Sequence, residues 1–125
     1  MKNVLLVGMG GFLGAASRYL LTEWVGRYSR AGGFPLGTVV VNLLGCFVLG
    51  FLAGIGDHKG TVSHHIRLLL MVGVLGGFTT FSTFGHETAS LFRDALPGQA
   101  VLNILISVVT GIIAAGVGYR LAHYL

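Results

Sequence analysis

The chain is built from four long apolar runs separated by short polar segments. Residues 3–17, 31–56, 68–86 and 95–119 contain no Asp, Glu, Lys or Arg. A helix needs about 20 apolar residues to cross the hydrocarbon core of a bilayer, and each run is close to that length or longer. The pattern predicts an all-α integral membrane protein. We expect one transmembrane domain over residues 1–125, with helices at about residues 2–25, 36–56, 66–92 and 98–122.

The composition supports a membrane environment for these helices. Of the 125 residues, 54% are hydrophobic and 10% are charged, too few charged side chains to cover the surface of a soluble domain of this size. A lone cysteine, Cys46, excludes an intrachain disulfide and a cysteine-based zinc site. The net charge of +4 comes from basic residues scattered singly between apolar runs, so we expect no nucleic-acid binding.

The N-terminal segment also has the layout of a signal peptide. Lys2 precedes an apolar run that ends in the small residues Gly14, Ala15 and Ala16. Cleavage there would leave three helices in a chain that is otherwise spaced for four. We therefore expect the segment to be retained as the first transmembrane helix.

The basic residues are divided evenly between the two sides of the membrane. Lys and Arg normally accumulate in cytoplasmic loops and so fix the orientation of a membrane protein. With four helices, the side of the termini carries Lys2, Lys59, Arg67 and Arg120, and the other side carries Arg18, Arg27, Arg30 and Arg93. Such a chain can insert in both orientations, which would permit an antiparallel dimer. The alternative is a weak orientation bias set by the crowding of Arg27 and Arg30.

Glycines are frequent, and many are spaced for helix packing. The chain has 21 glycines, including the small-xxx-small pairs Gly10/Gly14, Gly50/Gly54 and Gly73/Gly77. Small residues at this spacing let helix backbones approach closely in lipid, where no hydrophobic force drives the helices together. Four closely packed helices leave little interior for an aqueous pathway. An oligomer is therefore favoured, with any pathway at its interface.

The third apolar run is interrupted near its middle by residues that support a helix poorly. Gly76 and Gly77 are adjacent, and residues 79–83 include four hydroxyl side chains. This predicts a helix break, which is tolerated at membrane depth where the backbone is buried in protein or lines a water-filled cavity. Its freed carbonyls would coordinate a ligand, most simply a monovalent cation. The alternative is a kinked helix whose Ser and Thr hydroxyls bond back to their own carbonyls.

Two phenylalanines and an asparagine are candidates for contact with an ion. Phe81 and Phe84 share a helix face, and the positive edge of an aromatic ring can stabilise a small anion. Their spacing alone equally favours an ordinary lipid-facing or core role. Asn42, in the middle of the second run, can donate two hydrogen bonds to an anion.

Other polar residues form tracks along two helices. Thr38 aligns with Asn42 in the second helix, and Asn103, Ser107 and Thr110 align in the fourth. Buried hydroxyls and amides in lipid either hold helices together, which is usual for Ser and Thr, or offer donors to a permeating solute.

Enzyme signatures are missing from the sequence. The chain has no complete GxGxxG or GK[ST] motif, and its five histidines lie near the ends of the apolar runs. We therefore expect that the protein is not an enzyme. A proton-coupled exporter would need a carboxylate embedded in the first helix, where Glu23 is the available residue and lies near the helix end.

Three motifs, in this order, carry a resemblance to a known family. They are GGFLGA at residues 10–15 with RY at 18–19, GTVVVNLLG at 37–45, and GGFTTFSTF at 76–84. Together they resemble the CrcB/Fluc fluoride channel family, and the likeness runs from the first helix to the fourth. The main alternative is a small multidrug-resistance-type proton-coupled exporter, and a second is a non-transporting scaffold subunit.

The resemblance implies a specific architecture and a role for each motif residue. It implies a dual-topology antiparallel homodimer in the bacterial inner membrane, with two fluoride pores and a sodium ion at its centre. Flow of fluoride would be passive and would protect the cell from fluoride toxicity. Asn42, Phe81 and Phe84 would line the pore, and Gly76 and Thr79 would bind sodium through their backbone carbonyls. Arg18 would lie near an aqueous vestibule. Weaker candidates for a polar track along the pore are Thr38, Ser82, Thr83, Ser107 and Thr110.

Overall fold

The computed structural model describes residues 1–28, 33–60 and 62–124, and within these ranges all regular structure is helical. Helix α1 (Lys2–Tyr28) is followed by α2 (Leu36–Lys59), and the chain ends with α6 (Pro97–Ala122). Between α2 and α6 lies a segment of four consecutive helical pieces. Four stretches are long and apolar enough to span a membrane, which confirms the predicted four spans and makes the protein a multi-pass membrane protein.

The third span, His64–Arg93, changes its winding along its length. It begins with α3 (His64–Ile66), continues as the π-helix η1 (Arg67–Leu75), returns to α-helix in α4 (Gly76–Phe78) and ends with α5 (Phe81–Arg93). Between α4 and α5, Thr79 and Thr80 have extended backbone, with φ/ψ of −78°/156° and −149°/116°. The chain therefore leaves helical geometry for two residues near the middle of the span.

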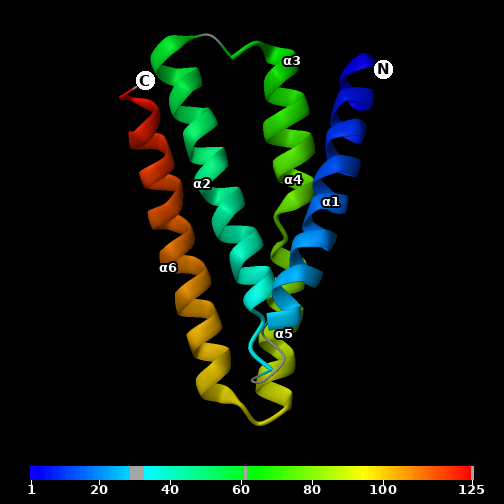
Figure 1. The fold of residues 1–125 in the computed structure, drawn as a ribbon, viewed down its shortest axis with the longest axis vertical. Coiled ribbons are helices and arrows are strands. Elements are labelled where there is room, and N and C mark those ends of the chain that lie inside the picture. The colour runs from blue at the N-terminus through cyan, green and yellow to red at the C-terminus, as the bar shows by residue number, and fades with distance from the viewer. Residues whose placement is uncertain (29–32, 61, 125) are drawn as a thin grey trace.

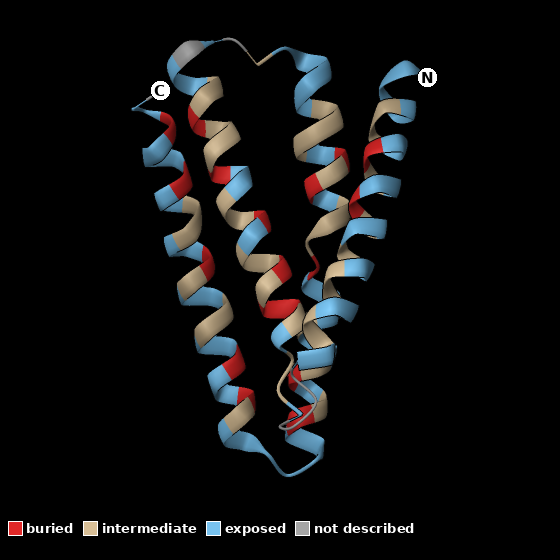
Figure 2. Ribbon diagram, viewed as in Figure 1, coloured by how far each residue is buried: buried red, intermediate tan, exposed pale blue. Residues whose placement is uncertain are grey.

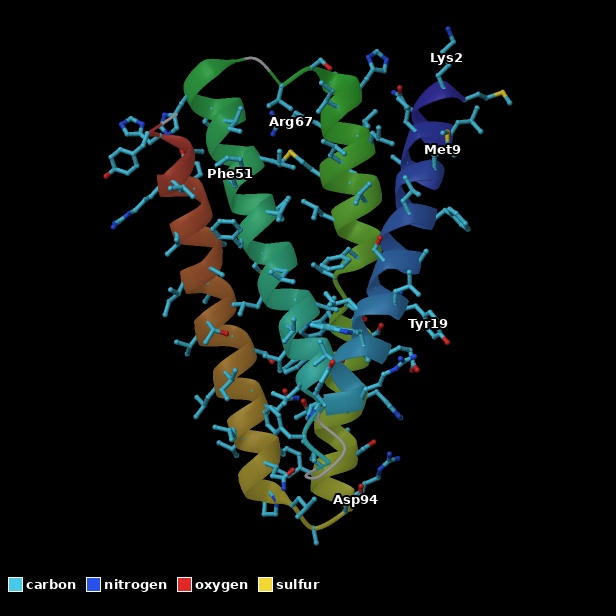
Figure 3. All side chains as sticks on the ribbon, in the orientation of Figure 1. Lys2, Met9, Tyr19, Phe51, Arg67 and Asp94 are labelled. Carbon is cyan, nitrogen blue, oxygen red and sulfur yellow. The ribbon has the colours of Figure 1, made fainter. Side chains whose placement is uncertain are left out.

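The helices are arranged as two parallel pairs that meet at one end of the molecule (Figure 1). Helix α2 packs along α6, and α1 packs along η1 and α4. Each pair joins two elements that run in the same direction, because one span in the opposite direction separates them in the chain. Both termini lie at the end where the two pairs diverge, near Lys2 and Arg67, whereas Asp94 lies at the opposite end (Figure 3).

Glycines bring each pair into backbone contact. A Cβ added at Gly14 of α1 would collide with the carbonyl oxygen of Val74 in η1, and one at Gly77 would lie 2.6 Å from the carbonyl oxygen of Gly11. In the other pair, a Cβ at Gly50 of α2 would collide with the carbonyl oxygen of Ala115 in α6. Glycines spaced four residues apart in the sequence thus lie along both helix seams, which are the contact of α1 with the third span and the contact of α2 with α6.

The buried residues form a thin line along these seams, and the outer faces are apolar and exposed (Figure 2). Val41 and Asn103 are the largest fully buried side chains among the described residues. For a chain in a bilayer, exposed apolar side chains face lipid or another protein. The first two helices also run longer than expected, because α1 continues to Tyr28 and α2 to Lys59. Arg30, counted in the charge balance, lies outside the described residues.

Candidate functional site

Asn42 of α2 is hydrogen-bonded to the extended segment of the third span. Its Nδ2 donates to the carbonyl oxygen of Thr80 at 3.1 Å, and its Oδ1 accepts from the Thr80 N–H at 2.8 Å. The side-chain amide therefore satisfies both backbone groups of a residue that is 8% exposed and lies outside a helix. These bonds use one of the two N–H donors of Asn42 and leave the other for a ligand.

Thr80 caps the helix that follows the break. Its Oγ1 accepts from the backbone N–H of Thr83 at 3.2 Å and donates to the Thr83 hydroxyl at 2.9 Å. The Ser82 hydroxyl lies 3.3 Å from the same oxygen. A Thr at this position satisfies a helical N–H that has no partner within the helix, so the sequence TTFST favours a helix start at Phe81. Ser82 and Thr83 thereby take part in the cap.

At the break, the N–H groups that would pair with two backbone carbonyls in a helix are bound elsewhere. In an α-helix, Gly76 O would accept from the N–H of Thr80, but that N–H is bound to Asn42. Thr79 O would accept from the N–H of Thr83, which is bound to the Thr80 hydroxyl instead. Thr79 O accepts from Arg18 Nη1 at 3.3 Å. The carbonyls of Gly76 and Thr79 are therefore among those at the break that have no helical donor.

A cleft of about 330 Å³ opens beside the break, between α2, the third span and α6. Its polar lining combines the amide of Asn42, the hydroxyl of Ser107 and the extended segment. The full lining is Asn42, Gly45, Cys46, Leu49, Met71, Leu75, Gly76, Thr79, Thr80, Phe81, Phe84, Ser107 and Val108. The shape of the cleft depends on Gly45, because a Cβ at that position would collide with Cγ2 of Thr79.

The two phenylalanines of the cleft form a ring pair on the first turn of α5. Their centroids are 5.6 Å apart with an interplanar angle of 47°. Phe84 is half-buried, whereas Phe81 is 83% exposed. Both rings thus line the cleft, together with the amide of Asn42.

Asn103 of α6 links that helix to the ring pair through α5. It is 1% exposed and donates from Nδ2 to Thr88 Oγ1 at 2.9 Å. Thr88 Oγ1 in turn donates to the carbonyl oxygen of Phe84 at 2.7 Å. The Ser107 hydroxyl donates to Asn103 Oδ1 at 3.4 Å. Sequence reasoning put Asn103 on a polar track but did not include it in the pore, although its amide in an apolar helix was a usable signal.

Five of the predicted polar residues do not line the cleft: Thr38, Ser82, Thr83, Thr110 and Arg18. Thr38 is buried and donates to Glu87 Oε1 at 2.8 Å beside a separate hollow of about 270 Å³. The other oxygen of that carboxylate, Oε2, is buried and has no hydrogen-bond partner in the described part of the chain. Thr110 donates to its own helix, at Ile106 O, over 2.6 Å. Arg18 lies half-buried against the break.

This arrangement suits a small ion better than a reaction. An amide, a hydroxyl and two phenyl rings line the cleft, where an anion could be bound, and the break offers carbonyl oxygens to a cation. In the described residues, no three or more His, Cys, Asp or Glu side chains gather into a metal-binding group. Glu23, the carboxylate that an exporter would need, is exposed near the end of α1.

The chain is similar to a described family and to several curated proteins. The family described as "CrcB-like protein, Camphor Resistance (CrcB)" matches residues 5–119. A protein of Methylobacillus flagellatus named fluoride-specific ion channel FluC is 46% identical over 97% of this chain and 94% of its own length. One of the same name from Oceanobacillus iheyensis is 46% identical over 99% of this chain and 94% of its own length. Fluoride-specific ion channel FluC 1 of Methanosarcina acetivorans is 41% identical over 100% of this chain and 97% of its own length.

Proposed function

The chain belongs to the CrcB-like family, and from this premise we propose that it is a fluoride-selective ion channel. The family is one of ion channels, so the protein is not an enzyme. The observation that carries the proposal is the cleft in which Asn42, Phe81 and Phe84 meet beside the break. Asn42 is far from Phe81 and Phe84 in the sequence, but together they supply the amide and the aromatic pair that an anion pathway needs.

The cleft supplies the groups that must replace water around fluoride. Fluoride is small and strongly hydrated, so a pore has to offer it hydrogen-bond donors while staying too narrow for larger anions. The amide of Asn42, with one N–H beyond its bond to Thr80, and the Ser107 side chain line the same cleft as the rings of Phe81 and Phe84. To donate to fluoride, the Ser107 hydroxyl would turn away from Asn103 Oδ1. None of these groups carries a positive charge, so the anion would be stabilised without being trapped. Flow would be passive, and it would protect the cell by letting fluoride leave.

We propose that two copies assemble as an antiparallel homodimer with two pores. The 83% exposure of Phe81 supports this assembly, because a second chain would cover the ring and close the open side of the cleft. The equal numbers of basic residues on the two sides, four and four, are compatible with insertion in both orientations. We place this dimer in the bacterial inner membrane, the location that the family resemblance implies.

A sodium ion at the centre of the dimer would be held by the carbonyls of Gly76 and Thr79. The fit rests on the hydrogen bonds at the break, which direct the N–H groups of Thr80 and Thr83 away from these two carbonyls. Gly76 is exposed, and its missing side chain leaves open space for a neighbour to approach. Thr79 O keeps a second lone pair beside its bond from Arg18. When bound, sodium would join the two broken helices and add positive potential beside the anion path.

Fluoride efflux from liposomes that contain the purified protein tests the proposed function. We expect fast fluoride efflux without chloride leakage, and loss of that efflux in Phe81→Ile and Asn42→Ala. No efflux from wild-type protein shown to be dimeric would contradict the proposal. Drug transport that depends on a pH gradient and on Glu23 would instead support an exporter.

The assembly is tested separately. Size-exclusion chromatography with light scattering should give the mass of two chains in sodium buffer. Replacing sodium by a large organic cation should shift this equilibrium toward single chains. A single chain in sodium buffer would contradict the dimer, and a dimer unaffected by removal of sodium would contradict the structural sodium ion.

A further inference from the structure

Two histidines meet at the end of the molecule that carries both termini. His58 lies in the last turn of α2, and His123 directly follows α6. Their Nδ1 atoms are 3.3 Å apart, and their ring centroids are 4.4 Å apart. Because α2 and α6 are parallel, their C-terminal ends lie at the same level (Figure 1). At about 1.5 Å per residue, His58 is roughly 24 Å along α2 from Asn42, so the proposed fluoride path does not use this pair.

The distance between the two nitrogens matches the spacing of two ligands on one metal ion. Two zinc–nitrogen bonds of about 2.0–2.1 Å at the tetrahedral angle place the nitrogens about 3.3–3.4 Å apart. The same distance also allows a long hydrogen bond between the two rings, since N–H···O bonds extend to about 3.2 Å. If one ring carries its proton on Nδ1, it donates to the other ring. If both Nδ1 atoms are unprotonated, their lone pairs face each other and a cation bound between them removes the repulsion.

The surroundings also favour a cation. A hollow of about 380 Å³ is lined by His58, Tyr119, Arg120, His123 and Tyr124, and both histidines are exposed. The carboxylate of Asp57 lies in the same cluster and accepts from the Tyr119 hydroxyl at 3.2 Å. The ends of two helices add the negative poles of both macrodipoles. Arg120 opposes a cation here, but it is exposed and therefore screened by solvent.

We propose that His58 and His123 bind one divalent transition-metal ion through their Nδ1 atoms. Imidazole suits zinc, copper and nickel, and Zn²⁺ adapts best to this tetrahedral spacing. Water completes the coordination, because the described residues hold no group of three metal-binding side chains. The bound ion connects the C-terminal ends of α2 and α6. This inference is independent of fluoride conduction.

Isothermal titration calorimetry with Zn²⁺ on the full-length purified protein tests the site, after removal of any purification tag. We expect one Zn²⁺ per chain, and His58→Ala and His123→Ala should each weaken the apparent affinity by at least about tenfold. The loss of an outer-shell partner alone costs about that much. The matched control is His64→Ala combined with His65→Ala. These residues are also exposed neighbours, but their ring centroids are 5.9 Å apart, and this variant should bind like wild type.

Thermal unfolding provides a second readout that does not depend on heat of binding. Zn²⁺ should raise the melting temperature of wild type and of the control variant, and raise that of His58→Ala by less, because stabilisation by a ligand falls with its affinity for the folded state. Absence of Zn²⁺ binding by wild type would overturn the proposal and leave the pair as hydrogen-bonded rings. Equal affinity of wild type, His58→Ala and His123→Ala would overturn it as well.

Discussion

Replacing Asn42 by aspartate should stop fluoride while leaving the shape of the cleft almost unchanged. Aspartate has nearly the same size as asparagine and keeps an oxygen that can accept from the Thr80 N–H, a bond of 2.8 Å in the structure. It loses the amide that donates to Thr80 O at 3.1 Å, and at neutral pH it adds a negative charge to the cleft. The substitution therefore changes the charge far more than the packing.

The magnitude follows from Coulomb's law. Two like charges about 4 Å apart repel by about 4 kcal/mol at the effective dielectric constant of roughly 20 that suits partly buried sites. Since 1.4 kcal/mol is a factor of ten, this repulsion lowers fluoride occupancy of the cleft by about a thousandfold. The substitution also leaves the buried Thr80 O without its donor and opposite a carboxylate oxygen, which costs at least about 1–3 kcal/mol of stability.

The assay is fluoride efflux from liposomes at neutral pH, with circular dichroism to show that the variant is folded. Asn3→Asp is the matched control, because it makes the same change at an exposed position at the start of α1. It should conduct like wild type. If folded Asn42→Asp conducted fluoride at the wild-type rate, the cleft beside Asn42 could not be the fluoride path.

Three further predictions concern the packing of the cleft and its polar lining. Gly45→Ala should lower stability by about 1–3 kcal/mol and reduce efflux, because the new methyl group would collide with Cγ2 of Thr79. Gly116→Ala, whose methyl group would meet nothing within 4 Å, is the control and should change neither the melting temperature nor the efflux rate. Asn103→Leu should lower stability by about 0.6 kcal/mol, the average for hydrogen bonds between membrane helices. It should also slow fluoride efflux without allowing chloride efflux. Unchanged fluoride efflux would show that the ring pair needs no support from α6. Ser107→Ala should slow efflux, but Thr110→Val should not, because Ser107 lines the cleft and Thr110 does not. The opposite order would place the path along another part of α6.

The spans and the packing seams could be predicted because they depend on local composition. An apolar run of membrane length favours a membrane-spanning helix, and glycines at four-residue spacing favour close helix packing, whichever helices become neighbours. The structure confirms the four spans. The region of the third span where Thr79 and Thr80 are extended could be anticipated for the same reason, since adjacent glycines and hydroxyl residues weaken a helix locally. Helix ends were less accurate, as α1 shows, because polar residues can continue a helix into the interface.

The partners of the polar residues could not be predicted, because they depend on which helices meet. Asn42 lies 38 residues from Thr80, and periodicity places it on a face without saying what that face touches. The same holds for Thr38 and Glu87, which are 49 residues apart. Thr110 was predicted on the polar track from its spacing, but its own backbone was an available acceptor. The roles of all these residues in conduction remain predictions.

The parallel pairing of the helices has a consequence for how the protein is made. Each helix packs mainly against a span that is inserted two steps later, α1 against the third and α2 against the fourth. Lateral association of inserted helices follows their insertion in lipid. During synthesis, α1 would be inserted before its partners η1 and α4, and Asn42 before its partner Thr80. The polar side chain of Asn42 would therefore face lipid or the insertion machinery until the third span is inserted. A chain whose synthesis stops after the second span would therefore lack the contacts of α1 with the third span and of α2 with α6. Membrane proteases should degrade such a chain faster than the full-length protein.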